Sequence, residues 1–210
     1  CGLSLLLGDL APEPAAGGRG VVCLSPALTE VVCHIGAGER LLGVADFTCH
    51  PPWTARLPRL GGAFNPSFEG ILALRPGLLI AQGRAARVRA FARRFGIAMP
   101  EEPIPLDTLG DLREAYTLVG KALGLPAAAA AARAELDRGL ARAAARRPAG
   151  AQGPRVLVAL GHRPGTLAGL YTATAGTFLG ELVAIAGGEN VMAGGTGLWP
   201  QLSLEQVRAA

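Results

Sequence analysis

Short apolar stretches alternate with amphipathic stretches along the first half of the chain. Residues 20–24 are apolar throughout, as is typical of a buried strand, and Ser25-Pro26 supplies the cap and first-turn proline of a helix that ends near Gly36. The same strand and helix patterns then recur. The sequence predicts strands at 41–45 and 78–81 and helices at 68–74 and 85–95. This alternation predicts an α/β fold with a mostly parallel sheet.

One predicted helix differs from the others in composition. Residues 127–147 are almost entirely Ala, Arg, Leu and Glu, with Pro126 at the start and Pro148 just past the end. A helix of this length extends roughly 30 Å. Because a strand and helix set precedes it and a new strand follows it, we favour a rigid strut between two lobes over a solvated surface helix.

The predicted elements divide the chain into four parts. These are a signal remnant or linker, an N-terminal α/β lobe, a connecting helix and a partial C-terminal α/β lobe, over residues 1–19, 20–125, 126–148 and 149–210. The last part contains a predicted strand at 155–160, a helix at 177–186 and a helix that begins at Ser203, where Gln206 fits a capping box. Because that helix has barely begun when the sequence ends, we expect an incomplete second lobe in a C-terminally truncated chain.

Composition and charge exclude several classes of protein. With 50% hydrophobic and 17% charged residues, the chain can bury a core and is not disordered. Its 30 glycines and 16 prolines follow no fixed period, which excludes a collagen-like protein. The net charge of +4 comes from arginines spread along several predicted helices without interleaved aromatic residues, so we expect no nucleic-acid partner.

The N-terminus and the cysteines leave several interpretations open. The chain begins with Cys1 and a short leucine-rich segment, which fits a lipid-modified exported protein, the remnant of an export signal, or a fragment. The other cysteines lack the C-x-x-C spacing of a zinc cluster or a redox motif, and a disulfide among them stays undetermined. They are Cys23, Cys33 and Cys49.

The sequence contains no recognisable catalytic or phosphate-binding motif. The loop 161–166 can present backbone N–H groups to an anion, and an enzyme that uses this loop at His162 is one alternative, although an ordinary turn is the simpler interpretation. Another alternative is a zinc- or manganese-binding protein that uses His50, His162 and carboxylates. The histidine spacing argues against a complete zinc site, and His34, inside the first helix, is expected to be a packed or surface residue.

Several residues in loops are better placed to contact a ligand than to fill a core. His50 lies in a proline-rich loop after a strand, where binding residues of α/β folds concentrate. Trp199 lies in a loop between Gly197 and Pro200, where its indole can stack on a flat ligand. The weaker aromatic candidates are Phe47, Phe64 and Tyr171.

Five segments, in order along the chain, together resemble one family. They are VVCLSPALTEVVCHIGAGERLLGV (21–44), the His50-Pro51-Pro52 turn, GGAFNPSFEGILALRPGLLIA (61–81), FLGELVAIAGGENV (178–191) and WPQLSLEQV (199–207). This pattern resembles the periplasmic substrate-binding proteins of ABC importers for cobalamin, ferric siderophores and haem. The resemblance implies two α/β lobes joined by one long rigid helix, with ligand held between the lobes. It also implies an exported monomer, periplasmic or lipid-anchored, with no enzymatic activity and no resident cofactor.

In that family one glutamate on each lobe docks against basic residues of the membrane permease. The matching positions here are Glu69 in NPSFEGI and Glu205 in LSLEQV. Both fall in the first turn of a predicted helix, where the positive end of the helix dipole tolerates a carboxylate that projects into solvent. The resemblance therefore implies ABC permease subunits as partners, with these two residues as contacts.

The resemblance favours cobalamin as the cargo, with a ferric siderophore or haem as alternatives. Trp199 matches an aromatic cleft position of cobalamin-binding members, and Phe47 lies where such members can place another aromatic residue. Two positions depart from the pattern, because Gly61-Gly62 replaces a tryptophan found in some cobalamin binders and Gln82 stands where another aromatic can occur. His50 stands where the family usually has tyrosine, so we expect it to pack against the edge of the ligand.

Overall fold

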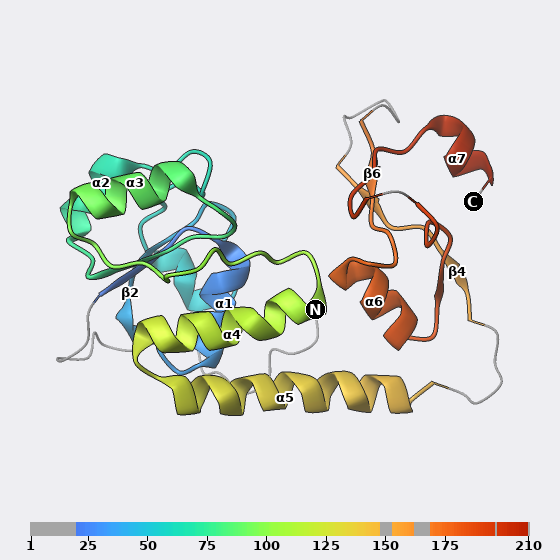
Figure 1. The fold of residues 1–210 in the computed structure, drawn as a ribbon, viewed down its shortest axis with the longest axis horizontal. Helices are drawn as coiled ribbons and strands as arrows, with labels where there is room; N and C mark the ends of the chain where they lie inside the picture. The colour runs from blue at the N-terminus through green and yellow to red at the C-terminus, as the bar shows by residue number, and fades with distance from the viewer. Residues whose placement is uncertain (1–19, 148–152, 162–168, 196, 210) are drawn as a thin grey trace. The chain divides into compact units, whose positions relative to one another are not determined.

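The computed structural model describes residues 20–147, 153–161, 169–195 and 197–209 (Figure 1). The chain forms two compact units. The first contains the described residues up to Pro105 together with Arg113–Arg133, and the second contains Leu106–Leu112 and the described residues from Ala134 onward. The long helix α5 (Pro126–Ala145) contributes residues to both units, so the predicted α/β architecture with two lobes and a long helix is confirmed.

A three-stranded parallel sheet forms the centre of the first unit. Its strands are β1 (Val21–Cys23), β2 (Leu41–Val44) and β3 (Leu78–Ile80), in the order β2-β1-β3. All three were predicted from their apolar runs. Because the strands are parallel, the loops that follow them leave from the same edge of the sheet.

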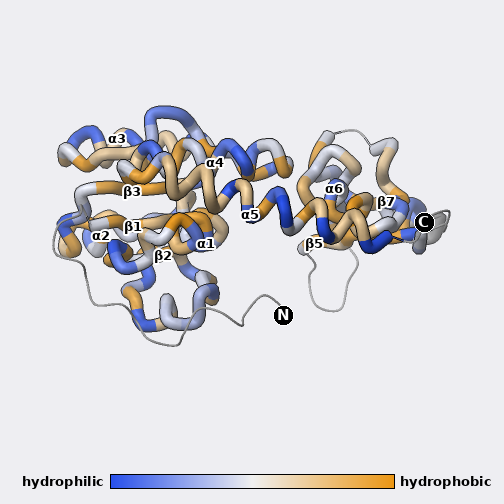
Figure 2. Tube along the Cα trace, turned by 90° about the horizontal axis from the view of Figure 1, so that it is seen from below, coloured by the Kyte–Doolittle hydropathy of each residue, from blue (hydrophilic) through white to orange (hydrophobic). Residues whose placement is uncertain are grey.

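Helices cover both faces of this sheet. Val22 and Leu79 pack against Ile71 of α2 and Val88 of α3 on one face, and strand alternation turns Val21 toward the other. Figure 2 shows the hydrophobic stretches of β1 and β3 passing between the helices of this unit. The described helical elements before α5 are α1 (Pro26–His34), η1 (Gly38–Arg40), η2 (Pro52–Arg56), α2 (Phe68–Leu74), α3 (Ala86–Arg94) and α4 (Leu109–Leu123).

The second unit contains short strands in two separate pairs. The predicted strand at 155–160 is wrong as one element, because it is interrupted at Leu157-Val158 and its two parts pair with different partners. The pairs are parallel β4 (Arg155–Val156) with β7 (Glu189–Asn190), and antiparallel β5 (Ala159–Leu160) with β6 (Tyr171–Thr172). The sequence reasoning missed β6 and β7, which are only two residues long.

The helices of the second unit begin where the sequence predicts. Helix α6 (Phe178–Ile185) is capped by the Thr177 hydroxyl, which accepts a hydrogen bond from the Gly180 amide at 3.1 Å. Helix α7 (Leu204–Ala209) begins with the predicted capping box, in which the Ser203 and Gln206 amides donate to each other's side chains at 2.9 and 3.2 Å. None of the described helices is both long and apolar enough to cross a membrane.

Candidate functional site

Two phenylalanines of the first unit expose nearly their whole side chains. Phe47 and Phe64 are 93% and 94% exposed, although the sheet and helices of the same unit bury most of their large apolar residues. Phe47 follows the end of β2 and has a φ of +62°, a left-handed conformation that is unfavourable for a bulky residue. Strained backbone that displays an aromatic ring is characteristic of binding loops.

Hydrogen bonds tie the two phenylalanine loops together. The Asp46 amide donates to the Gly61 carbonyl at 3.1 Å, and the Gly61 amide donates to the Asp46 carboxylate at 3.2 Å. The Gly62 amide donates to the Asn65 side chain at 3.0 Å and closes the turn that contains Phe64. Gly61 has a φ of +75°, and a Cβ there would overlap the Asn65 carbonyl oxygen, so only glycine fits.

The loops after β1 and β3 complete this edge of the sheet. The Ser25 hydroxyl caps α1 by accepting from the Leu28 amide and also donates to the Gln82 side-chain oxygen at 3.3 Å. Gln82 is exposed, and the amide of the following residue, Gly83, donates to the Ile104 carbonyl at 2.7 Å. Gln82 therefore presents a polar amide at the same edge of the sheet as the exposed aromatic loops.

His50 is also exposed and lies at the end of the loop that carries Phe47. The bond between His50 and Pro51 is cis, and the Pro51 carbonyl accepts the Thr54 hydroxyl at 2.7 Å. Between Phe47 and His50, the Thr48 hydroxyl is buried and has no hydrogen-bond partner among the residues that the structure describes. We define Phe47, His50, Phe64 and Gln82 as the aromatic edge of the first unit.

Trp199 belongs to the second unit and already has partners there. Its indole N–H donates to the Asp107 carboxylate at 2.8 Å, and its ring lies 5.9 Å from that of Phe178, at an interplanar angle of 59°. The Phe178 amide donates in turn to the Asp107 carbonyl at 2.7 Å. The indole is half-buried, so its stacking on a ligand stays a prediction. Tyr171, on β6, is 48% exposed.

Both glutamates that match permease-docking positions are exposed on short helices. Glu69 lies in the first turn of α2, after the Ser67 cap, whose hydroxyl accepts from the Gly70 amide at 3.3 Å. Glu205 lies in the first turn of α7, after the Ser203 cap. The predicted placement of both carboxylates at helix starts is confirmed; their docking role stays a prediction.

The described residues offer no metal cluster, and two of their three thiols are made unreactive by burial. No group of three His, Cys, Asp or Glu side chains among them is arranged to hold a metal ion. Cys23, Cys33 and Cys49 are free thiols, and burial raises the pKa of Cys23 to about 11 and that of Cys33 to about 12. His162 and its loop lie outside the described residues, and His34 bonds the Tyr116 hydroxyl through Nδ1 at 2.7 Å.

The structure thus brings four of the predicted ligand residues together on one unit and places Tyr171 and Trp199 on the other. Sequence reasoning missed the residues that organise these sites, above all Asp46 and Asp107. A signal for Asp46 existed, because a polar residue directly after a buried parallel strand lies at the edge where ligands bind. Asp107 carried no such signal, since its partner Trp199 is distant in sequence.

The fold and the exposed strand-end loops define a ligand-binding protein of the α/β class. The chain belongs to the periplasmic binding protein family, whose model matches residues 21–210. Two curated relatives are both named vitamin B12-binding protein. The one from Yersinia pestis (strain Pestoides F) is 29% identical over 208 residues, covering 97% of this chain and 71% of the relative. The one from Pectobacterium atrosepticum is 27% identical over 191 residues, covering 89% of this chain and 67% of the relative.

Solved structures of binding proteins also resemble the chain. A periplasmic haem-binding protein from Roseiflexus sp. RS-1 superposes with a TM-score of 0.76 at 29% identity, covering 92% of this chain and 73% of that one. The periplasmic vitamin B12-binding protein of Vibrio cholerae superposes with a TM-score of 0.71 at 24% identity, covering 94% and 74%, and shows the shared fold. All four of these relatives are binding proteins rather than enzymes.

Proposed function

We propose that the chain is the substrate-binding component of an ABC importer, which captures a flat metal chelate outside the cytoplasm and delivers it to a membrane permease. Cobalamin is the favoured cargo. Haem is the second candidate, because solved haem-binding relatives reach 29–30% identity and TM-scores of 0.75–0.76. No bond of the cargo is made or broken, since the protein only binds and releases it.

The observation that carries this proposal is the pair of phenylalanines on the aromatic edge. The two rings are 93% and 94% exposed to water. Covering them with an apolar ligand is therefore favourable, because it removes apolar surface from water. Their loops are joined by the Asp46–Gly61 hydrogen bonds, so little conformational entropy is lost when a ligand binds. A corrin or porphyrin has the broad apolar face that such rings recognise.

The polar residues of the aromatic edge, Gln82 and His50, can contact the polar groups at the periphery of such a ligand. Gln82 supplies an amide held by Ser25, and cobalamin and haem both carry polar side groups around an apolar macrocycle. His50 is exposed and supplies an imidazole that can contact the ligand edge or, with haem, the iron. Loss of the iron-bound imidazole changes the absorption spectrum of haem, which separates these two roles.

We further propose that Glu69 and Glu205 contact basic residues of the permease. Each carboxylate is exposed and stands at a helix start that its serine cap holds in place. Exposed charge pairs of this kind mainly steer and orient a complex, so their effect falls as salt increases. In the described part of the chain, no cluster of metal-binding side chains favours the alternative of a bare-metal protein.

The proposal is tested by titrating the chain with cyanocobalamin, haemin and a ferric hydroxamate siderophore, following tryptophan fluorescence and calorimetric heat. We expect tight saturable binding of one chelate. The double variant Phe47→Ala/Phe64→Ala should bind it about 100-fold more weakly, because two buried rings contribute roughly 3 kcal/mol and each 1.4 kcal/mol is about tenfold in affinity. Phe95→Ala is the matched control, because Phe95 is another exposed phenylalanine of the same unit.

The outcomes separate the candidates. Binding of cyanocobalamin alone supports the favoured cargo, and binding of haemin with a Soret band that shifts in His50→Ala supports haem with histidine ligation. A folded protein that binds none of the three chelates contradicts the proposal. An equal loss of affinity in Phe95→Ala and in the double variant contradicts the assignment of the aromatic edge.

A further inference from the structure

The positive charge of the first unit is concentrated on and beside helix α3. Six arginines and no acidic residue lie between Glu69 and Glu101, so this stretch alone exceeds the net charge of +4 of the whole chain. Four of these arginines are exposed on or just before the helix: Arg84, Arg87, Arg93 and Arg94. Within the described part of the chain none of the four forms an ion pair. We call these four residues the arginine surface.

The arginine surface is built against apolar side chains. The guanidinium of Arg87 lies over the ring of Phe68 at 6.0 Å, and that of Arg94 lies over Phe95 at 5.6 Å. Phe95 is itself 47% exposed, because α3 ends at Arg94 and leaves this ring at the boundary of the helix. Arg87 therefore rests on a partly buried ring and Arg94 on an exposed one, and both guanidiniums keep their charge at the surface.

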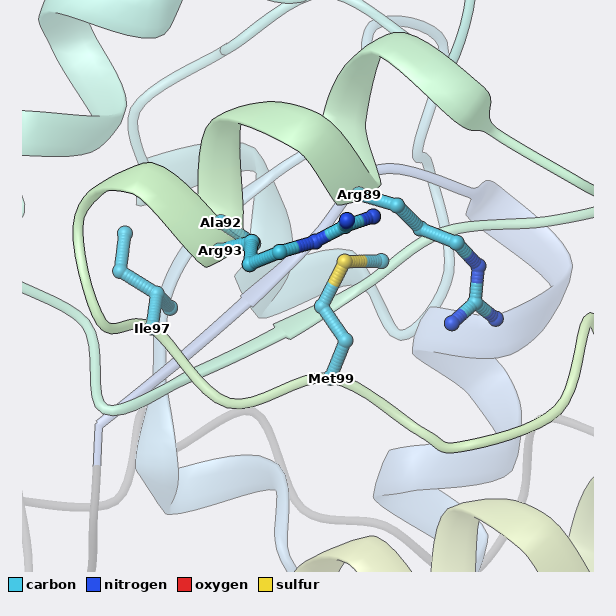
Figure 3. Close-up of a pocket in the computed structure, with 5 residues that line it drawn as sticks. All are labelled: Arg89, Ala92, Arg93, Ile97 and Met99. Carbon is cyan, nitrogen blue, oxygen red and sulfur yellow. The ribbon is translucent and has the colours of Figure 1, made fainter.

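Arg93 lies on the other flank of α3, above a shallow pocket of about 230 Å³. Figure 3 shows its side chain extended along the helix over the Met99 sulfur, while Arg89 bends away from it. Arg89 donates to the carbonyls of Pro100, Glu101 and Glu102 at 2.9, 3.3 and 2.8 Å. Arg89 therefore fixes the following loop against α3, whereas Arg93 stays exposed on this flank.

The positions of the arginines favour a flat and extended anionic partner. Arg87 and Arg94 lie on one flank of α3 and Arg93 on the other, and only the small exposed residues Ala86 and Ala90 stand between them. Guanidiniums on different flanks are poorly placed to share one small anion, but each can bind its own phosphate on a lipid headgroup layer. We propose that the arginine surface binds anionic phospholipid headgroups, with Phe95 and Met99 as its apolar rim.

The proposal does not depend on the cargo, so its test stands apart from the chelate titrations. The whole chain is mixed with phosphatidylcholine vesicles, with and without phosphatidylglycerol, and the fraction that sediments is measured. We expect binding only to the anionic vesicles, lost when added salt shortens the Debye length well below about 10 Å. The triple variant Arg87→Gln/Arg93→Gln/Arg94→Gln should bind about 100-fold more weakly, since each cation near an anionic surface contributes roughly fivefold.

Helix α5 offers a matched control for net charge. Arg133, Arg138 and Arg142 are exposed there beside the acidic residues Glu135 and Asp137, so their triple Gln variant has the same net charge as the α3 variant. Vesicle binding that survives the α5 changes but not the α3 changes supports the proposal. Equal losses in the two variants, or a wild-type chain that ignores anionic vesicles at low salt, overturn it. Release of the chain by inorganic phosphate, at an ionic strength where sodium chloride does not release it, also overturns it in favour of a soluble anion.

Discussion

The two units display aromatic side chains in opposite ways. In the first unit, Phe47 and Phe64 project from loops whose backbone is tied by Asp46 and Gly61, and their side chains are almost fully exposed. In the second unit, Trp199 packs on Phe178 and donates its indole N–H to Asp107. In the first unit the hydrogen bonds hold the backbone of the loops and leave the rings free. In the second unit the hydrogen bond to Asp107 holds the Trp199 ring itself. We infer that the first arrangement provides ligand surface and the second provides stability.

If this contrast holds, the largest loss of folding stability should follow substitution of Trp199. Trp199→Ala should lower the free energy of unfolding by about 3 kcal/mol, because it removes a packed ring and leaves the Asp107 carboxylate without its donor. Urea unfolding monitored by circular dichroism measures the change. Trp199→Phe should recover about half of the loss, because it keeps the ring contact with Phe178 and removes only the hydrogen bond.

The corresponding substitution in the first unit, at Phe47, should not lower folding stability. Phe47→Gly removes an exposed ring from a residue with a φ of +62°, so stability should stay the same or rise by up to about 1 kcal/mol. A loss at Phe47 as large as that at Trp199 would remove the distinction between the two units. It would also assign Phe47 to the core of the first unit rather than to its ligand surface.

Gly61 tests whether the backbone truly holds the phenylalanine loops. Gly61→Ala should cost about 2 kcal/mol, because a Cβ meets the Asn65 carbonyl and the φ of +75° strains any other residue. Thermal unfolding of the variant is compared with that of Gly62→Ala, where a Cβ meets only the Asn65 side-chain oxygen at 3.4 Å. Equal melting temperatures for the two variants would show that the turn is not fixed by Gly61.

Most of the first unit could be predicted because its signals are local. Strands β1, β2 and β3 are apolar runs bounded by turn residues, and Ser25-Pro26 identifies the start of α1. Each of these signals is contained within a few neighbouring residues, so no tertiary information is needed to recognise it.

The second unit was predicted less well because its secondary structure depends on contacts between segments that are distant in sequence. Strands β4 to β7 have two residues each, and the segment 170–174 is ordered by pairing with 198–202, as in the Thr172 amide bond to the Pro200 carbonyl at 3.0 Å. The exposure of Phe47 and the partner of Trp199 likewise depend on tertiary structure. Aromatic residues in loops identified the candidates, but only the fold distinguishes a free ring from a packed one.

A small effect on stability is also expected at two threonines that support the loop of Phe47. Thr54 is buried and its hydroxyl donates to the Pro51 carbonyl at 2.7 Å. The Thr48 residue is only 2% exposed, and its hydroxyl has no partner in the described part of the chain. Thr54→Val should therefore cost about 1 kcal/mol, and Thr48→Val should be neutral or slightly stabilising. The pair is matched in chemistry and burial, so chemical denaturation of the two variants isolates the hydrogen bond. If Thr48→Val proves the more costly change, its hydroxyl has a partner, such as an ordered water, that helps hold Phe47 in place, and the loop depends on more than Asp46 and Gly61.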